Sequence, residues 1–176
     1  MKKLFFIIPA LMLALTATAQ QARKDFKRDI TLSASNYVAY PGPQKALTPA
    51  PKGYTPYYIS HYGRHGSRYL IGTNDYERPY DMLLKAQKQG MLTAKGEETL
   101  SKIKTIKDEA WKRDGELTLR GAEQHRGIAK RMYERFPEVF KGDVRVDAKS
   151  TIVIRCILSM ENARHQLKPM NPKLAI

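Results

Sequence analysis

The sequence predicts an α/β fold, a layered sandwich of strands and helices. Short runs rich in β-branched and aromatic residues, at 57–62, 144–148 and 150–154, are typical of strands. The longer segments between them carry apolar residues at helical spacing. Because strands that alternate with helices are typical of α/β sandwiches, this order favours that class over an all-α or all-β protein.

The first predicted strand runs directly into a cluster of charged and flexible residues. Its apolar part, 57–59, is followed at 64–68 by the sequence Arg-His-Gly-Ser-Arg. The guanidinium groups of Arg64 and Arg68 suit the oxygen atoms of a phosphate group. The imidazole of His65 between them can act as nucleophile, acid or base. The end of this strand therefore predicts an anion-binding site.

Two helices are predicted after this motif. The first runs to about residue 89, with Asn74 or Asp75 as its cap and a glycine after it. Thr93 suits the N-cap of the second, which continues to about residue 114, and we expect Trp111 to pack against the body of the protein. The outer faces of both helices are rich in lysine, and no chemistry is assigned to them.

A third helix is predicted to begin after Thr118, which is a natural N-cap. Ala122, His125 and Ala129 then fall on one apolar face of it. We interpret His125 as a core or helix-surface histidine, because a single histidine on an apolar face is more often structural than catalytic.

The last predicted strand, 150–154, ends at Arg155 and is followed by a helix to about Leu167. In a parallel sheet the carboxyl ends of neighbouring strands open into one crevice, where ligands bind. Adjacent strands at 57–62 and 150–154 would place Arg155 beside the motif at 64–68. The alternative is that Arg155 is a salt-bridged residue at a strand end.

These elements, in this order, resemble the histidine phosphatase superfamily in its acid phosphatase and phytase branch. The wider context is similar to bacterial secreted members related to multiple inositol polyphosphate phosphatase. The motif at 64–68 is similar to the family's RHGxR, and 117–124 is similar to its LT..G..Q element. Arg155 fits the place of the family's third phosphate-binding arginine. The resemblance implies a phosphoglycerate-mutase-like sandwich with a mainly parallel sheet.

The same resemblance implies a phosphomonoester hydrolase that works without a metal ion or another cofactor. It implies that His65 becomes phosphorylated and that Arg64, Arg68 and Arg155 hold the phosphate. The substrate class that it implies is a small phosphorylated molecule, an inositol polyphosphate such as phytate.

The sequence departs from this family in its second half. The family's general acid comes from a late His-Ala-Glu or His-Asp motif, and His165, the one histidine after Arg155, has no such neighbour. The late strands and the helical cap of the family are missing as well. We therefore interpret 20–176 as the N-terminal part of a histidine phosphatase domain, a truncated chain whose own turnover we expect to be poor.

The N-terminal residues 1–19 have the pattern of a secretory signal peptide: a basic start, an apolar run and small residues before the cut. We therefore expect an exported protein, periplasmic or secreted, without stable membrane insertion after the signal is removed. The single cysteine, Cys156, excludes an internal disulfide, and its apolar surroundings predict a buried packing role.

The chain is strongly basic, with 31 lysine and arginine residues against 17 aspartate and glutamate residues and a net charge of +14. This balance suits a polyanionic partner. Export and the lack of a nucleic-acid-binding motif argue against nucleic acid. Two alternatives to an enzyme remain: a non-catalytic phosphate- or polyanion-binding protein of the cell envelope, and a basic interaction protein whose motif match is accidental. A mutase is disfavoured by the signal peptide.

Overall fold

The computed structural model describes residues 21–34, 38 and 45–176 of the chain. It divides into two compact units, Met1–Ala46 and Leu47–Ile176. The predicted signal peptide lies outside the described residues. The described part of the first unit holds a helical stretch at 21–28 and the short 3-10 helix η1 (Ile30–Ser33).

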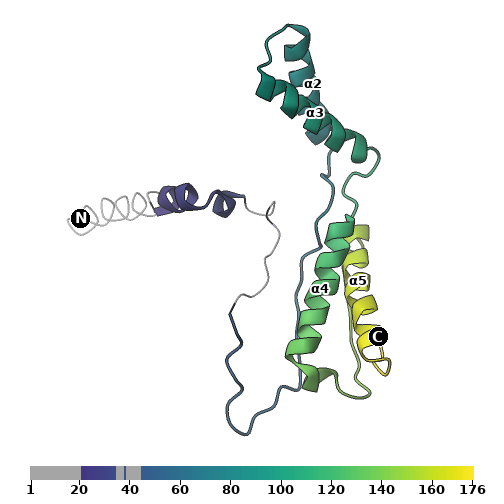
Figure 1. Cartoon of the computed structure of the whole chain (residues 1–176). Helices are drawn as coiled ribbons and strands as arrows, with labels where there is room; N and C mark the ends of the chain where they lie inside the picture. Colours follow the sequence, from purple (N-terminus) through teal and green to yellow (C-terminus); the bar gives the residue numbers. More distant parts are fainter. Residues whose placement is uncertain (1–20, 35–37, 39–44) are drawn as a thin grey trace, which may run out of the picture. The chain divides into compact units, whose positions relative to one another are not determined.

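The second unit begins its regular structure with a helical hairpin of α2 (Asn74–Lys88) and α3 (Ala94–Glu109) (Figure 1). The Thr93 side chain accepts a hydrogen bond from the N–H of Gly96 at 3.2 Å, so the predicted cap is confirmed. The expected burial of Trp111 is wrong, because its side chain is 59% exposed.

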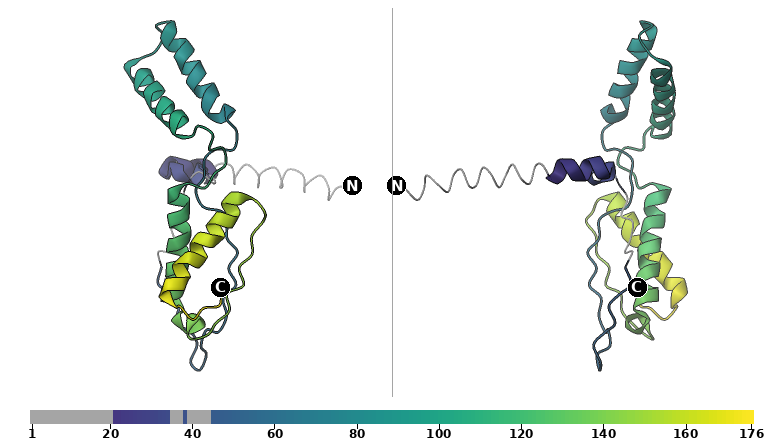
Figure 2. Two further views of the ribbon diagram at one scale, coloured as in Figure 1. Left: turned by 90° about the vertical axis from the view of Figure 1, so that its right-hand side faces the viewer. Right: turned by 60° about the vertical axis from the view of Figure 1, so that its left-hand side comes forward.

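Two longer helices, α4 (Leu119–Arg135) and α5 (Ile154–Met170), pack side by side in the second unit (Figure 2). The Thr118 side chain caps α4 as predicted, accepting from the N–H of Gly121 at 3.1 Å. The short 3-10 helix η3 (Pro137–Phe140) follows α4. The most buried apolar cluster of the described residues lies between these elements and the last residues of the chain: Ala129, Phe140, Leu167 and Leu174.

The expectation of an α/β sandwich with a mainly parallel sheet is wrong for this structure, which is helical. The described residues contain no strand and only two isolated bridges, Arg68 to Leu117 (antiparallel) and Arg145 to Ala175 (parallel). A strand exists only where its N–H and C=O groups pair with a neighbouring chain segment. Residues 57–62 are irregular and largely exposed, and Tyr57 is 91% exposed.

The predicted strand at 150–154 is also wrong. Helix α5 already begins at Ile154, so Arg155 lies in the first turn of a helix and not at the end of a strand. A short run of β-branched residues does not by itself distinguish a strand from the start of a helix. The residues before the helix remain exposed, with Ile152 at 93%.

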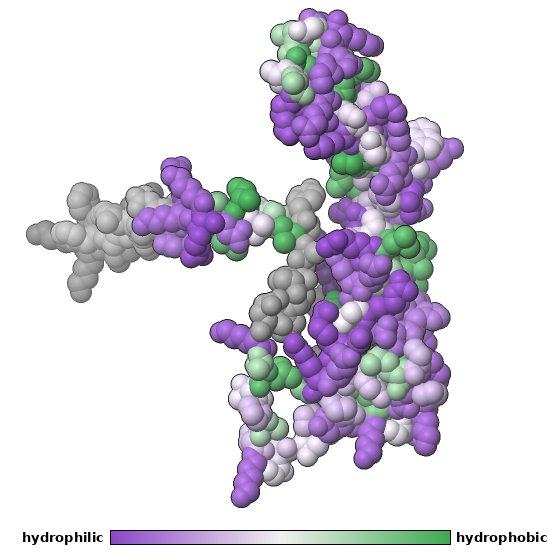
Figure 3. Space-filling model, viewed as in Figure 1, coloured by the Kyte–Doolittle hydropathy of each residue, from purple (hydrophilic) through white to green (hydrophobic). Residues whose placement is uncertain are grey.

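The described surface is mostly hydrophilic over the helices, with apolar patches between the polar side chains (Figure 3). Several large apolar or aromatic side chains of the second unit are exposed: Tyr57, Tyr58, Tyr62, Leu119, Ile152 and Ile154.

Candidate functional site

The glycine of the Arg-His-Gly-Ser-Arg motif is hydrogen-bonded to α5. The buried N–H of Gly66 donates a hydrogen bond to Ser159 Oγ at 3.0 Å. The Ser159 hydroxyl in turn donates to the backbone carbonyl of Arg155 at 2.7 Å. Ser159 is 2% exposed, so both of these bonds are shielded from water. One hydroxyl therefore connects the motif to the turn of α5 that carries Arg155.

The residue after this glycine is hydrogen-bonded to the start of α4. The N–H of Ser67 donates to Gln124 Oε1 at 2.8 Å, and Gln124 Nε2 donates to Ser67 Oγ at 2.9 Å. The Thr118 hydroxyl donates to the Ser67 carbonyl at 2.9 Å, and the Thr118 N–H reaches the same oxygen at 2.9 Å. The threonine and glutamine of the LT..G..Q element thus hold the residue that follows His65 and Gly66.

Two glycines allow the motif and α4 to touch backbone to backbone. A Cβ atom built on Gly66 would lie 2.4 Å from the carbonyl oxygen of Gly121. A Cβ atom built on Gly121 would lie 2.2 Å from the carbonyl oxygen of Ser67. Both distances are shorter than the non-bonded contacts that Cβ atoms make in proteins. Side chains at these two positions would therefore force the two segments apart.

The motif continues into a short antiparallel pairing between 67–70 and 115–118. The N–H of Tyr69 donates to the carbonyl of Glu116 at 2.9 Å, and the N–H of Gly115 donates to the carbonyl of Leu70 at 2.9 Å. This pairing sets the backbone of Arg68 against the turn that leads into α4.

Two of the predicted arginines reach this same pairing. Arg68 Nη1 donates to the carbonyl of Tyr69 at 2.8 Å, and Arg155 Nη1 makes a long contact of 3.4 Å with the carbonyl of Gly115. Among the described residues, neither guanidinium has a partner for its buried Nε atom. Buried donors are normally paired, so each of these arginines has one donor that the structure leaves unused and closed off from solvent.

The ring of His65 is half-buried and its tautomer follows from its neighbour. His65 Nδ1 lies 2.8 Å from the carbonyl oxygen of Gly66. A carbonyl can only accept, so Nδ1 carries the proton in this hydrogen bond. The lone pair of the neutral ring is then on Nε2. The side chain of Arg64, in contrast, is exposed.

His125 lies on the buried face of α4 and is 7% exposed. Burial lowers the pKa of His125, with smaller contributions in the same direction from His61 and His65, and the backbone of Arg64 opposes the shift. The buried position was predicted from the sequence.

Ser159 was not identified from the sequence. Its position four residues after Arg155 places both residues on one side of a helix, which is a spacing that the sequence does contain. The hydrogen bond to Gly66, across 93 positions of the chain, depends on the packing of α5 and has no local signal.

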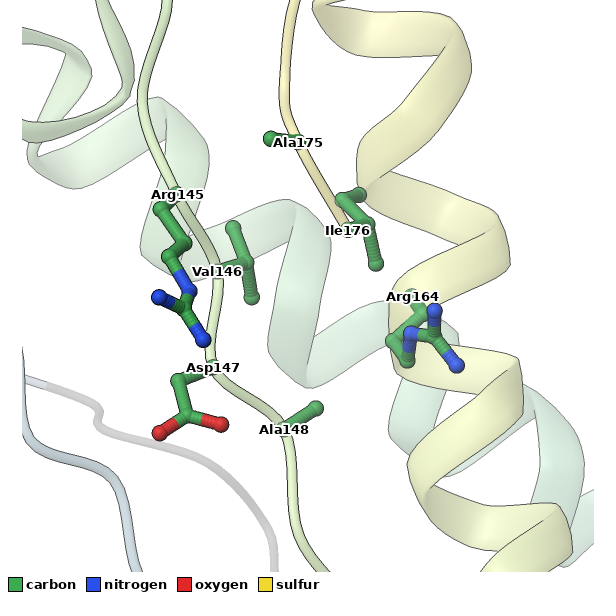
Figure 4. Close-up of a pocket in the computed structure, with 7 residues that line it drawn as sticks. All are labelled: Arg145, Val146, Asp147, Ala148, Arg164, Ala175 and Ile176. Carbon is green, nitrogen blue, oxygen red and sulfur yellow. The ribbon is translucent and has the colours of Figure 1, made fainter.

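A hollow of about 420 Å³ lies beside α5 and the last residues of the chain (Figure 4). It contains none of His65, Arg64, Arg68 and Arg155, and we do not assign it to the motif. Its lining combines charged and apolar side chains: Arg145, Val146, Asp147, Ala148, Arg164, Ala175 and Ile176.

Within the described ranges, no group of three or more histidine, cysteine, aspartate or glutamate side chains is arranged to hold a metal ion. No helix in the same part of the chain is both long and apolar enough to cross a membrane.

The chain matches no protein-family model and no curated protein. It is similar to two solved structures of the multiple inositol polyphosphate phosphatase of Bifidobacterium longum. One is the complex with phosphate, with a TM-score of 0.61, and the other is the complex with inositol hexasulfate, with a TM-score of 0.59. Sequence identity is 28% in both, over 73% of this chain.

The match spans only 26% and 27% of the length of those two chains. The similarity nevertheless agrees with the family resemblance of the sequence motifs. Over this part of its relatives' length, the chain resembles the multiple inositol polyphosphate phosphatases.

Proposed function

We propose that this chain carries the nucleophile and phosphate-binding residues of a histidine acid phosphatase, a phosphomonoester hydrolase for inositol polyphosphates such as phytate. The observation that supports this most is that the motif is hydrogen-bonded both to α5 and to α4. This arrangement brings Arg155 near the motif through Ser159. The solved relatives contribute the substrate class, since they were obtained with phosphate and inositol hexasulfate.

The proposed reaction has two displacements at phosphorus. In the first, Nε2 of His65 forms a bond to phosphorus while the ester P–O bond breaks, and the leaving alkoxide takes a proton from solvent water. In the second, water attacks the phosphohistidine, the N–P bond breaks, and inorganic phosphate leaves. Arg64, Arg68 and Arg155 are proposed to stabilise the charge on the phosphoryl oxygens during both steps.

The expected rate of hydrolysis depends on how readily the leaving alkoxide receives a proton. A positioned general acid contributes on the order of 10²–10⁴ in rate. None of the four proposed residues is assigned this role, so we propose slow turnover by this chain with phosphate binding intact. The proposal includes export through the N-terminal signal peptide and action in the periplasm or outside the cell.

A second candidate function is phosphate binding without hydrolysis. The guanidinium groups of Arg68 and Arg155, which both reach the pairing beside the motif, favour it, because a guanidinium can bind an anion whether or not His65 reacts. This function predicts saturable binding of inorganic phosphate with no phosphate released from phytate.

The test measures phosphate release from phytate, and phosphate binding by calorimetry, on the purified chain. We expect His65→Ala to abolish release while phosphate still binds, and Arg68→Ala or Arg155→Ala to weaken binding about tenfold or more, as loss of a charge-assisted hydrogen bond does. His165→Ala, at an exposed position of α5, is the matched control and should change neither. Release that survives His65→Ala would overturn the enzymatic proposal, and unchanged binding in both arginine variants would overturn the binding site.

A further inference from the structure

Tyr69, the residue after the motif, connects the motif to the end of α3. Its hydroxyl group donates to Glu109 Oε1 at 2.9 Å and accepts from Arg113 Nη1 at 2.7 Å. Glu109 is the last residue of α3, and Arg113 lies in the segment that follows it. The guanidinium of Arg113 also lies over the Tyr69 ring, 4.4 Å from its centroid. Both the hydroxyl and the ring of Tyr69 are therefore held by Arg113.

The backbone of Tyr69 contacts one of the proposed phosphate-binding arginines. Its carbonyl oxygen accepts the 2.8 Å hydrogen bond from Arg68 Nη1, and its N–H pairs with the carbonyl of Glu116 at 2.9 Å. The side chain of Glu116 forms a 3.2 Å salt bridge with Arg113 Nε. Arg113 therefore spans the short antiparallel pairing, because it holds a side chain from each of the two paired segments.

The second of these segments carries the contact of Arg155. Gly115, whose carbonyl lies 3.4 Å from Arg155 Nη1, directly precedes Glu116. Its φ of +71° lies in the left-handed region, and a Cβ built on it would lie 3.2 Å from Arg155 Nη1. The position of this guanidinium therefore depends on a turn whose next residue is held by Arg113.

We propose that Arg113 is a positioning residue for the phosphate-binding arginines: by holding the two paired segments together, it fixes the carbonyl groups that orient Arg68 and Arg155. This inference deepens the proposed function and rests on it for what the two guanidinium groups bind. Arg113 is assigned no contact with phosphate and acts only through the paired backbone.

The contacts of Arg113 are partly open to solvent, so their loss should displace the site without unfolding the chain. The side chain of Arg113 is 41% exposed and that of Glu116 is 54% exposed. Ion pairs and cation–π contacts are each weak at such positions. The hairpin also keeps a second attachment, because the N–H of Leu70 donates at 2.6 Å to the hydroxyl of Tyr76, a buried residue of α2.

The test compares wild type with R113A, Y69F and K112A. R113A removes the salt bridge, the hydrogen bond and the cation–π contact, whereas Y69F removes only the hydroxyl and changes no charge. Lys112 is the exposed neighbour of Arg113, so K112A removes the same positive charge but leaves these contacts in place. Three quantities are measured on each chain at fixed ionic strength: the melting temperature, the affinity for inorganic phosphate, and the ¹H–¹⁵N signals of the Nε–H groups of Arg68 and Arg155.

We expect R113A to weaken phosphate affinity about fivefold and Y69F about threefold, and both to shift the signals of Arg68 and Arg155. K112A should change the affinity by less than about twofold, because salt screens an exposed charge, and should leave the arginine signals in place. A cluster that only attaches the hairpin would lower the melting temperature in R113A and Y69F and leave the arginine signals as they are in K112A. That result would overturn the proposal.

If R113A does not fold, Y69F decides the outcome, because shifted arginine signals support the proposal and unchanged signals refute it. The two proposals fail separately. Absence of both phosphate binding and phytate hydrolysis in wild type counts against the proposed function, while the arginine signals still report on Arg113. Phosphate binding by wild type, with arginine signals that neither R113A nor Y69F shifts, counts against Arg113 alone.

Discussion

At the scale of single residues, the burial of His125 links stability to pH. Burial lowers the pKa of its ring below the ordinary value of 6.5, so the folded chain takes up this proton at a lower pH than the unfolded chain does. At pH values between the pKa of His125 in the folded chain and its pKa in the unfolded chain, the unfolded state binds more protons. The free energy of unfolding should therefore be highest above about pH 6.5 and should fall as the pH is lowered through that window.

The measurement is urea denaturation at several pH values, with wild type compared to H125Q. The carboxylates titrate in both chains, so the difference between the two curves isolates His125. We expect wild type to lose stability relative to H125Q as the pH falls below about 6.5. Parallel curves at all pH values would contradict the assignment of the shift to burial of this ring.

The residue scale also shows where sequence patterns stop being informative about the site. The motif at 64–68 is contiguous, so it could be found from the sequence. The hydrogen bond between Ser159 and Gly66 could not, because its partners lie 93 positions apart in the chain. Serine is an ordinary residue type in a helix, and only the packing of α5 gives it a neighbour in the motif.

At the scale of elements, the helices were predictable and the strands were not. Thr93 and Thr118 were identified as N-caps because a cap is a local hydrogen bond to a residue three positions away. A strand depends on a partner segment that local sequence does not specify. The stretches 57–62 and 150–154 have strand-like composition, yet neither is paired with a neighbour among the described residues.

The close approach of α4 to the motif gives a prediction at this scale. In G121A the new methyl group would meet backbone atoms of Ser67, 2.2 Å from its carbonyl oxygen, and these atoms are held by their own hydrogen bonds. We expect destabilisation by about 1–3 kcal/mol or more, as for other overpacked positions, and displacement of the motif from α4. Chemical denaturation and phosphate affinity measure the two effects.

The matched control lies in the same helix. A Cβ on Gly127 would meet only the end of the flexible Arg131 side chain, at 3.2 Å. G127A should therefore gain about 0.5–1 kcal/mol from the better helix propensity of alanine and leave phosphate affinity unchanged. Equal effects of G121A and G127A would show that the backbone contact at Gly121 is not close in solution.

At the scale of the whole molecule, burial is unevenly distributed over the described helices. The buried apolar cluster of Ala129, Phe140, Leu167 and Leu174 belongs to α4, α5 and the segments that follow them. Helices α2 and α3 contribute one buried residue each within their bounds, Tyr76 and Leu100. The motif takes its hydrogen bonds from α4 and α5, so the proposed site depends on the better-packed pair.

Helix α3 of the hairpin carries charged pairs on its own surface. The Glu98 carboxylate pairs with Lys95 and Lys102, and Lys104 pairs with Asp108. All of these side chains are exposed, and exposed pairs contribute roughly 0–1 kcal/mol each. Salt screens them further. Such pairs do not replace a buried core.

We therefore predict that amide hydrogens of α3 exchange with solvent faster than those of α4 and α5, measured by mass spectrometry at neutral pH. Local opening needs less free energy where few apolar contacts are broken. Raising the salt concentration should widen the difference, because it weakens the ion pairs of α3 and leaves the apolar cluster intact. Protection of α3 equal to that of α4 in high salt would contradict this prediction and would mean that the hairpin and the motif open as one cooperative unit.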